Sequence, residues 1–373
     1  MTELSTLLAQ AGNRRDANRA VSLPLTLSSN YRHESLEEAR AFDSAKGYTY
    51  SRLATPTRRV LEETLAAMEG GTRAFATSSG MAAIQLALSI LKPGDELVAL
   101  DDLYGGDFRY FDYLKEHAGI SVRTWDGQRI ADLVAQLTPR TRLVWLETPS
   151  NPLMKTVAIA AVAQAVHAAQ PAVLLAVDNT FLTPVYQQPL RLGADLVVHS
   201  ATKYLSGHND LLGGVLVVAD PQLAAAYENY ALTTGDTLAS FDSWLLLCSL
   251  KTLPVRMKQH TAGARALVER LKDLPAVTGV RYPGVGGMIS FTLQSEAQVT
   301  RLLDHLQLIT FAESLGGVES LITIPYYQTH ADIPAEDRKR RGLTPCLLRL
   351  SVGLEDPNDL FADLRQALAA KGK

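Results

Sequence analysis

The sequence predicts an α/β fold with a large, doubly wound, mostly parallel sheet, followed by a smaller α+β domain. Three observations support this prediction. Short apolar runs typical of strands alternate with helical segments from about residue 73 to about residue 230, as in repeated βα units. These runs lack polar alternation, which indicates strands covered on both faces. The pattern then changes near residue 236, where a long helical segment begins.

The expected elements follow in chain order. We expect an N-terminal arm over 1–47, a large domain over 48–235 and a C-terminal domain over 236–373. Apolar periodicity and turn residues predict, in the large domain, helices over 58–69, from 78–81 to Leu91 and over 158–170, and strands over 73–77, 96–100, 142–146, 172–178, 196–198 and 213–219. They predict, in the C-terminal domain, a helix over 240–271 that kinks or breaks at Pro254, strands near 288–293 and 347–352, and helices near 295–306 and 356–369.

Composition narrows the class of protein. A chain of 373 residues can form two domains with substantial cores, and 47% hydrophobic with 20% charged residues is typical of a globular protein. The net charge of -3, from 36 basic and 39 acidic residues, gives no electrostatic reason to expect a nucleic-acid or membrane partner. Cys248 and Cys346 lie in apolar surroundings and are expected to be ordinary core thiols, which favours a cytoplasmic location.

Targeting and membrane segments are not expected. The N-terminus lacks a basic patch followed by an apolar core, so no signal peptide is predicted. Two uncharged stretches, 74–91 and 156–177, are interrupted by polar residues and fit helices, turns and strands better than membrane spans. No metal site is predicted either.

One lysine, Lys203, is the candidate nucleophile. The apolar run Leu196 to Val198 predicts a buried strand, and the loop after it holds Ser200, Thr202 and Lys203. A lysine forms a Schiff base with a carbonyl only when its amine can lose a proton, which a partly desolvated site favours. The two hydroxyls beside it could hold a phosphate. Taken alone, a loop lysine is more often an exposed surface residue.

A second stretch of sequence favours a functional role for Lys203 over that of an exposed surface residue. Residues 172–178 form an apolar run that ends in Asp178, and ligands of open α/β sheets bind at the carboxyl ends of strands. Asp178 by itself could be a cap or turn residue. However, a carboxylate that lies one strand before a lysine able to form a Schiff base suits the ring nitrogen of pyridoxal phosphate, because that nitrogen needs an acidic or arginine partner. The two stretches together predict a pyridoxal-phosphate site.

Other segments offer groups that could complete such a site. Ser78, Ser79 and Gly80 precede a helix, an arrangement that can bind a phosphate or can simply be a serine cap. Two glycines after Tyr104 would let the backbone approach a ligand while the ring offers a stacking face. Arg349 interrupts an apolar strand, so it needs an anionic partner, either a substrate carboxylate or a structural ion pair.

Glycine fingerprints of other cofactors are missing from the sequence. It contains neither Gly-x-Gly-x-x-Gly nor Gly-x(4)-Gly-Lys-Ser/Thr, which argues against a dinucleotide-binding or P-loop protein. A nicotinamide-dependent dehydrogenase would therefore be supported only by the βα alternation.

A series of motifs in chain order resembles the Cys/Met-metabolism family of pyridoxal-phosphate enzymes, which have the aminotransferase-like fold type I. The motifs span nearly the whole chain: Tyr50-Ser-Arg-x-x-x-Pro-Thr, Ser79-Gly-Met-Ala-Ala, Asp102-Leu-Tyr-Gly-Gly, Glu147-Thr-Pro-Ser-Asn-Pro, Val177-Asp-Asn-Thr-Phe, Ser200-Ala-Thr-Lys-Tyr, Glu313-Ser-Leu-Gly-Gly-Val-Glu-Ser-Leu and Arg349-Leu-Ser-Val-Gly. Thr49 and Thr55 depart from the family pattern, since many relatives have an acid and an asparagine at these positions.

The resemblance implies a role for each matching residue. Lys203 would hold the cofactor and move protons, Asp178 would pair with the ring nitrogen, and Tyr104 would stack on the ring and help to deprotonate the substrate amine. The implied phosphate ligands are Gly80, Met81, Ser200 and Thr202, together with Tyr50 and Arg52 from a neighbouring subunit. The implied ligands of the substrate are Asn151, Arg109, Glu313, Ser314 and, for its α-carboxylate, Arg349. The implied assembly is a homo-oligomer with shared active sites, at least a dimer and usually a tetramer built from dimers.

Within the family, the sequence favours reactions at Cγ. Arg109 and Glu313 resemble the γ-lyase and γ-synthase pattern, so the expected substrate is a small sulfur amino acid such as cystathionine, or an activated homoserine ester. The segments 101–106 and 311–315 favour cystathionine γ-lyase activity. The alternatives are γ-synthase activity, then cystathionine β-lyase or methionine γ-lyase activity, and, from a different class, an inactive binding or regulatory module with the same fold.

Overall fold

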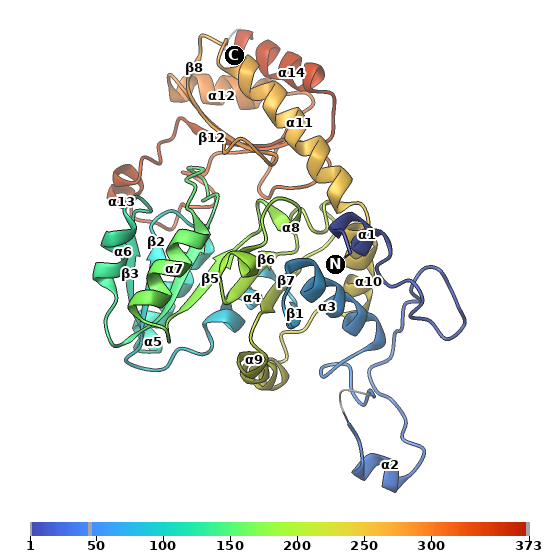
Figure 1. Ribbon diagram of the computed structural model, residues 1–373. Helices are drawn as coiled ribbons and strands as arrows, with labels where there is room; N and C mark the ends of the chain where they lie inside the picture. The colour runs from blue at the N-terminus through green and yellow to red at the C-terminus, as the bar shows by residue number, and fades with distance from the viewer. Residues whose placement is uncertain (1, 44–46, 371–373) are drawn as a thin grey trace.

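The computed structural model describes residues 2–43 and 47–370, and within them two sheets carry the fold (Figure 1). The strands of the larger sheet are β1 (Arg73–Thr77), β2 (Glu96–Leu100), β3 (Ser121–Trp125), β4 (Thr141–Glu147), β5 (Leu174–Asp178), β6 (Leu196–Ser200) and β7 (Gly214–Val218). They lie in the order β1-β7-β6-β5-β4-β2-β3. Strand β7 pairs antiparallel with β6 and β1, whereas the other neighbours pair in parallel. The prediction of a doubly wound, mostly parallel sheet is confirmed.

Helices cover the larger sheet on both faces. They are α3 (Pro56–Glu69), α4 (Gly80–Leu88), α5 (Gly105–His117), α6 (Ile130–Gln136), α7 (Ile159–Ala169), α8 (Thr183–Tyr186), the 3-10 turn η1 (Pro189–Leu192) and α9 (Pro221–Thr234). One cluster of buried apolar side chains joins the strands to α4, α5, α7 and α9. A second joins β1, β6 and β7 to α3, α1 (Leu4–Ala9) and α10 (Ser240–Leu250).

The predicted long helix after residue 240 is broken. Helix α10 ends at Leu250, and α11 (Leu253–Leu271) starts again with Pro254 in its first turn. Proline fits there because the first turn of a helix needs no backbone donor at that position. Figure 1 shows α11 running from the larger sheet towards the smaller one. The break therefore gives the chain the change of direction that takes it out of the large sheet region.

The smaller sheet lies in the C-terminal part of the chain. Its strands, in the order β10-β11-β12-β9-β8, are β8 (Val277–Arg281), β9 (Met288–Leu293), β10 (Thr310–Phe311), β11 (Leu321–Thr323) and β12 (Leu347–Ser351). Helices α11, α12 (Glu296–His305) and α14 (Pro357–Ala369) pack on it around a third apolar cluster, and α13 (Ala335–Arg340) lies in the loop before β12. The second, smaller sheet is confirmed, while the boundary at residues 235 and 236 stays a prediction.

Part of the N-terminal arm extends away from the rest of the chain, whereas its Leu8, Ala11 and Leu23 are buried in the core cluster with α3 and α10. Between residue 10 and α3 the only helix that the structure describes is α2 (Leu36–Arg40), and Figure 1 shows this region projecting beyond the sheets. Its apolar side chains Val21, Leu27 and Leu36 are exposed to solvent. In the described part of the chain, no helix is both long and apolar enough to span a membrane.

Candidate active site

A cavity lies at the carboxyl ends of β4, β5 and β6, where the first turn of α4 meets the loops that follow these strands. Its walls are formed by Ser79, Gly80, Met81, Ile84, Tyr104, Glu147, Asn151, Asp178, Thr180, Phe181, Ser200, Thr202, Lys203, Leu212 and Leu315. Strand order explains the meeting point, because parallel strands deliver their carboxyl ends to one edge of the sheet. The structure thus brings together nine of the residues that the sequence analysis singled out, namely Ser79, Gly80, Met81, Tyr104, Asn151, Asp178, Ser200, Thr202 and Lys203.

Lys203 lies in the turn that directly follows β6, and its side chain points into the cavity wall. Its Nζ donates a hydrogen bond of 2.7 Å to Ser314 Oγ. The pKa of Lys203 is lowered from 10.5 to about 8, chiefly by burial and in addition by the nearby Arg349 guanidinium. A buried ammonium is poorly solvated, so the neutral amine becomes accessible near neutral pH. The group has the properties of a nucleophile for a carbonyl.

Asp178 ends β5 and faces the same cavity. Its Oδ1 accepts a hydrogen bond of 2.9 Å from the Thr180 amide. Burial raises the pKa of Asp178, and the hydrogen bond from Thr180 opposes this rise. A carboxyl in such a setting can pair with a basic ring nitrogen, since a cationic partner would offset the cost of its burial.

The start of α4 offers an anion site. Ser79 caps the helix, because its Oγ accepts a hydrogen bond of 3.1 Å from the Ala82 amide. A Cβ on Gly80 would lie 2.9 Å from both Cβ and Oγ of Ser200, so only glycine fits in this place. The first amides of a helix lack intrahelical acceptors and attract a phosphate. The hydroxyl of Thr202, also in the wall, is engaged with the backbone of Gly213.

Tyr104 precedes α5 and forms another side of the cavity. Its amide donates a hydrogen bond of 2.7 Å to Glu147 Oε2. A Cβ on Gly106 would lie 2.4 Å from the Tyr104 ring and 2.8 Å from the Met81 sulfur, so the glycine makes room for the ring. Burial raises the pKa of Tyr104. The ring is therefore a neutral, half-buried aromatic surface beside the phosphate end of the cavity.

Arg349 lies behind the cavity on β12 and connects several predicted residues. Its Nη1 donates to Asn151 Oδ1 at 2.9 Å, and its Nη2 donates to the Ser314 carbonyl at 3.0 Å and to Thr323 Oγ1 at 3.2 Å. Its Nε has no hydrogen-bond partner among the described residues. Burial lowers the pKa of Arg349 to about 10. A guanidinium with an unused buried donor is suited to a carboxylate ligand.

Ser314 joins the lysine to the arginine. Its side chain accepts from Lys203 while its carbonyl accepts from Arg349. Its φ of 85° is unusual for a residue with a side chain and stores roughly 1–3 kcal/mol of backbone strain. Strain of this kind persists where surrounding contacts fix a residue, as these two hydrogen bonds do.

Six of the residues with an implied cofactor or substrate role lie outside the cavity wall, and two of them, Arg349 and Ser314, are described above. Arg109 forms an exposed ion pair with Asp332, with 2.6 Å between Nη1 and Oδ2. Glu313 precedes Ser314 and acts on Lys203 and Arg349 through its charge. Tyr50 and Arg52 lie in the segment before α3, where Arg52 Nη1 donates to the Leu232 carbonyl on α9. Their proposed roles stay predictions.

Two buried acids were not assigned a role from the sequence. Glu147 ends β4 and is paired in register with Asp178 across the β4–β5 ladder. Asp107, in the first turn of α5, is fully buried, and neither of its carboxyl oxygens has a hydrogen-bond partner in the described part of the chain. Burial raises the pKa of both carboxyls, and Asp178 raises it further. Within the described ranges, no group of three or more His, Cys, Asp or Glu side chains could hold a metal ion.

Pyridoxal phosphate fits this arrangement. Its aldehyde would meet the desolvated amine of Lys203, its ring nitrogen the carboxyl of Asp178, and its phosphate the start of α4, where Gly80 leaves space. Each group of the cofactor meets protein chemistry of the matching kind. The fold and the site therefore define a pyridoxal-phosphate-dependent enzyme.

Comparison with known proteins identifies the family to which the chain belongs. It belongs to the Cys/Met metabolism family of PLP-dependent enzymes, whose profile matches residues 5–369. The chain is 47% identical over 368 residues to cystathionine gamma-synthase of Haemophilus influenzae, with 98% of each chain covered. It is also 47% identical over 366 residues to cystathionine gamma-synthase/O-acetylhomoserine (thiol)-lyase of Bacillus subtilis, with 98% of this chain and 96% of the relative covered.

Solved structures agree with this family. Cystathionine gamma-lyase from Lactobacillus plantarum, complexed with L-serine, superposes with a TM-score of 0.93 at 39% identity, and 99% of each chain is covered. Cystathionine gamma synthase from Xanthomonas oryzae pv. oryzae, in complex with cystathionine, gives 0.92 at 40% identity, with 99% of this chain and 98% of that chain covered. The chain is thus an enzyme of the trans-sulfuration family.

Proposed function

We propose that this enzyme catalyses γ-replacement, in which the thiol of cysteine replaces the acyl group of an activated homoserine ester to give cystathionine. The observation that carries this proposal is the 47% identity, over nearly the whole chain, to two proteins named as γ-synthases, against 41% for a γ-lyase and a β-lyase. The preference for a γ-lyase drawn from segments 101–106 and 311–315 is untested, and the identities favour the synthase.

The residues of the site supply binding and proton transfer for such a reaction. Arg349 and Asn151 bind the α-carboxylate of the substrate, with the unpaired Nε of Arg349 as an additional donor. Tyr104 covers one face of the reacting groups; taking a proton from the substrate amine would require its phenolate, which its raised pKa disfavours. Bound pyridoxal phosphate supplies an electron sink for negative charge at Cα.

Lys203 moves the protons. With a pKa of about 8, its neutral amine accepts a proton from Cα, passes that proton on, and can then accept a second proton from Cβ, while Ser314 holds its Nζ by a hydrogen bond. The acyl group then leaves Cγ as a carboxylate, and the cysteine sulfur forms a bond to Cγ after its thiol gives up a proton. At the end of the reaction Lys203 returns a proton to Cα and to Cβ. The products are cystathionine and the free carboxylic acid.

A γ-elimination on cystathionine is the second candidate. It requires the same proton transfers but ends with water in place of cysteine, and it releases cysteine, 2-oxobutanoate and ammonia. The superposition on the Lactobacillus plantarum γ-lyase supports it. The two reactions differ in whether a thiol or water completes the sequence, which depends on access to the cavity.

A substrate panel on the holoenzyme tests the proposal. Purified enzyme with bound pyridoxal phosphate is given O-acetyl- or O-succinylhomoserine plus cysteine, and in parallel cystathionine alone, and the products are measured by mass spectrometry. The proposal predicts cystathionine from the ester at a higher kcat/KM than 2-oxobutanoate from cystathionine. Release of 2-oxobutanoate from cystathionine without product from the esters would contradict it.

We also propose that two copies of the chain share each active site. Tyr50 is half-exposed and Arg52 lies outside the cavity of its own chain, and both follow directly after the arm, part of which projects from the fold (Figure 1). In a homo-oligomer, Tyr50 and Arg52 would bind the cofactor phosphate of a neighbouring copy. The exposed apolar side chains of the arm support this arrangement, since association would cover them.

A further inference from the structure

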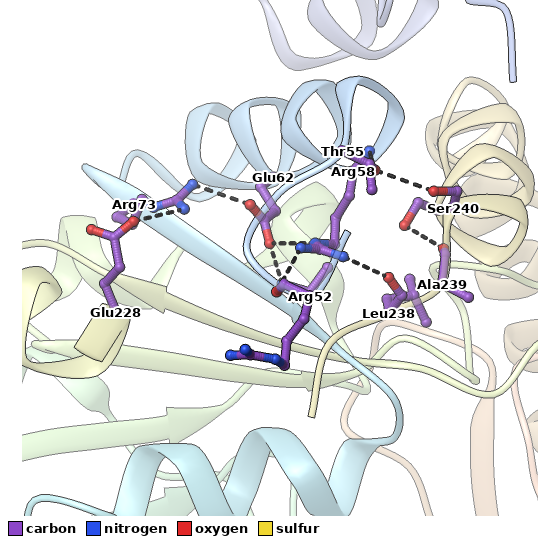
Figure 2. A network of polar contacts seen from close by, with 11 residues as sticks. Arg52, Thr55, Arg58, Glu62, Arg73, Glu228, Leu238, Ala239 and Ser240 are labelled. Carbon is purple, nitrogen blue, oxygen red and sulfur yellow. Dashed lines mark hydrogen bonds and ion pairs between the residues drawn. The ribbon is translucent and has the colours of Figure 1, made fainter. Parts of the chain in front are cut away.

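A network of buried charges lies at the start of α3, directly after the segment that holds Tyr50 and Arg52 (Figure 2). Arg58 is 3% exposed and Glu62 is 8% exposed. Arg58 Nε lies 3.7 Å from Glu62 Oε1, one helical turn away. Charged side chains are seldom buried to this degree unless partners satisfy them. The network is outside the cavity of its own chain, so the chemistry of that cavity does not explain it.

Arg58 binds two other parts of the chain through its guanidinium. Its Nη2 donates to the Arg52 carbonyl at 3.1 Å, and its Nη1 donates to the Leu238 carbonyl at 3.2 Å. Its own amide donates to Thr55 Oγ1, which caps α3. Figure 2 shows Arg58 between Arg52 on one side and Leu238 on the other. The side chain thus fixes the backbone at Arg52 against the segment before α10.

Glu62 holds Arg58 and connects it to the sheet. Its Oε2 lies 3.1 Å from Arg73 Nη1, and its Oε1 accepts a hydrogen bond of 3.1 Å from the Ala76 amide. Arg73 and Ala76 belong to β1, which leads directly into the Ser79 cap of α4. The Leu238 amide donates in turn to the Ala76 carbonyl. The Arg52 segment is therefore coupled to the strand that precedes the phosphate loop.

Arg58 and Glu62 each favour the charged form of the other in this buried position. Burial lowers the pKa of Arg58 and raises that of Glu62, and each charge opposes the shift of the other. Two carbonyls and a carboxylate around one guanidinium also demand its planar, forked set of donors. A lysine would keep the positive charge but could not reach all three acceptors. The geometry, beyond the charge alone, is thus what Arg58 contributes.

We propose that Arg58, held by Glu62, is a positioning residue that fixes the Tyr50–Arg52 segment so that it can bind the cofactor phosphate in a neighbouring copy. The inference rests on the shared active site proposed above. Arg58 itself touches neither the cofactor nor the substrate. Its effect passes through the backbone carbonyl of Arg52.

Cofactor binding with and without a phosphate separates this role from a structural one. The variant Arg58→Lys is compared with the wild-type enzyme for its affinity towards pyridoxal phosphate and towards pyridoxal, by the visible absorbance of the lysine adduct. We expect pyridoxal phosphate affinity to fall about tenfold or more, as for the loss of a hydrogen bond to a charged group, with pyridoxal affinity unchanged. Equal losses for both ligands, or no loss, would overturn the proposal.

A matched control uses an exposed arginine elsewhere. Arg129 forms a solvent-exposed ion pair with Asp132 at the start of α6, far along the sheet order from β1. Arg129→Lys is expected to leave both affinities at the wild-type level. If Arg58→Lys unfolds in a thermal melt, Glu62→Gln replaces it in the same comparison, since the amide keeps the shape but loses the charge that holds Arg58.

Hybrid oligomers test whether the effect acts across the subunit boundary. Differently tagged Arg58→Lys and Lys203→Ala chains are refolded or co-expressed together and the hybrid is purified. In it, the pocket that retains Lys203 receives Arg52 from a chain with an intact Arg58. We expect pyridoxal phosphate affinity of that pocket to return to the wild-type value. Affinity that stays at the level of the Arg58→Lys homo-oligomer would refute a role through Arg52.

A second hybrid keeps the two proposals apart. An oligomer that contains both Arg52→Ala chains and Lys203→Ala chains tests only whether active sites are shared between copies. If this hybrid regains affinity and the Arg58→Lys hybrid does not, sharing holds and the positioning role fails. If neither regains affinity, the shared site itself fails, and the positioning role, which depends on it, fails with it.

Discussion

Lys203 combines burial with a neighbouring guanidinium, and this sets the pH range in which it can react. Because burial disfavours the ammonium, the pKa of Lys203 falls from 10.5 to about 8, and the reactive neutral amine forms at lower pH than on an exposed lysine. The rate at which the cofactor-free enzyme captures pyridoxal phosphate should rise with pH up to about 8 and level off above it. Stopped-flow absorbance between about pH 6 and pH 10 measures this. A rise that continues towards pH 10 would contradict the assignment.

Replacement of the same lysine gives a second outcome. In Lys203→Ala the amine that captures the cofactor and moves the protons is gone, so the bound enzyme should lose its visible absorbance band and its turnover should fall by about 10²–10⁴-fold or more. Spectra and steady-state rates measure the two effects. Lys155→Ala, which removes an ion pair with Asp101 outside the cavity wall, is the control and should keep the band.

Arg349 should act on substrate binding. In Arg349→Lys the single ammonium cannot replace a fork that already serves Asn151, Ser314 and a substrate carboxylate. Truncation at a buried, hydrogen-bonded charge pair costs about 2 to 5 kcal/mol, so we expect a large increase in KM and a smaller change in kcat. Steady-state kinetics on the holoenzyme measure both. An unchanged KM with a reduced kcat would mean that the residue acts elsewhere.

Sequence reasoning identified some of these residues better than others. Lys203 and Asp178 could be predicted because each follows an apolar strand, and the sheet brings such ends together. Glu147 ends a strand in the same way, but its pairing with Asp178 depends on the spatial order of the strands, which the chain order does not reveal. The ion pair of Arg109 with Asp332 could not be foreseen, because it joins residues 223 positions apart.

This dependence on spatial arrangement also explains which helices and strands the sequence predicted correctly. Strands such as β5 and β6 are continuous apolar runs buried on both faces, so composition predicts them. Strand β3 lies at the edge of the sheet and is largely exposed along its length, and β10 has two residues, so neither leaves an apolar run. The helix that opens with Gly80 was expected to reach Leu91 but ends at Leu88. Local sequence therefore predicts strands that are buried on both faces. The positions of edge strands and helix ends depend on contacts with the rest of the fold.

Helix caps offer a test of α4 with an internal control. Ser79 caps α4 and Ser295 caps α12, and each Oγ accepts from the amide three residues ahead. Replacing either serine with alanine should cost about 1 kcal/mol of stability. Only Ser79→Ala should also weaken pyridoxal phosphate binding, because only α4 directs its free amides into the cavity. Urea unfolding of both variants and cofactor titration measure the two effects. Equal cofactor affinity in both variants would argue against α4 as the phosphate site.

The exposed apolar side chains of the arm favour association between copies of the chain. Part of the arm leaves apolar groups in solvent, and the arm is followed directly by Tyr50 and Arg52, whose proposed target lies on another copy. A folded chain gains little from an extended segment of this kind unless a partner covers it. If each pocket takes Tyr50 and Arg52 from a neighbour, as proposed, cofactor affinity should depend on association.

A charge placed on the arm tests this dependence. Leu27 is 73% exposed, so Leu27→Glu costs little within one chain, but in an assembly it would bury an unpaired carboxylate. We expect this variant to shift towards smaller species in sedimentation velocity and to bind pyridoxal phosphate more weakly at low protein concentration, with recovery at high concentration by mass action. Tyr113→Glu, at 54% exposure on α5, is the control and should change neither property. Weaker association of Leu27→Glu with undiminished cofactor affinity would show that each chain binds its cofactor alone, whereas a parallel loss of both would tie the arm to the pocket of its neighbour.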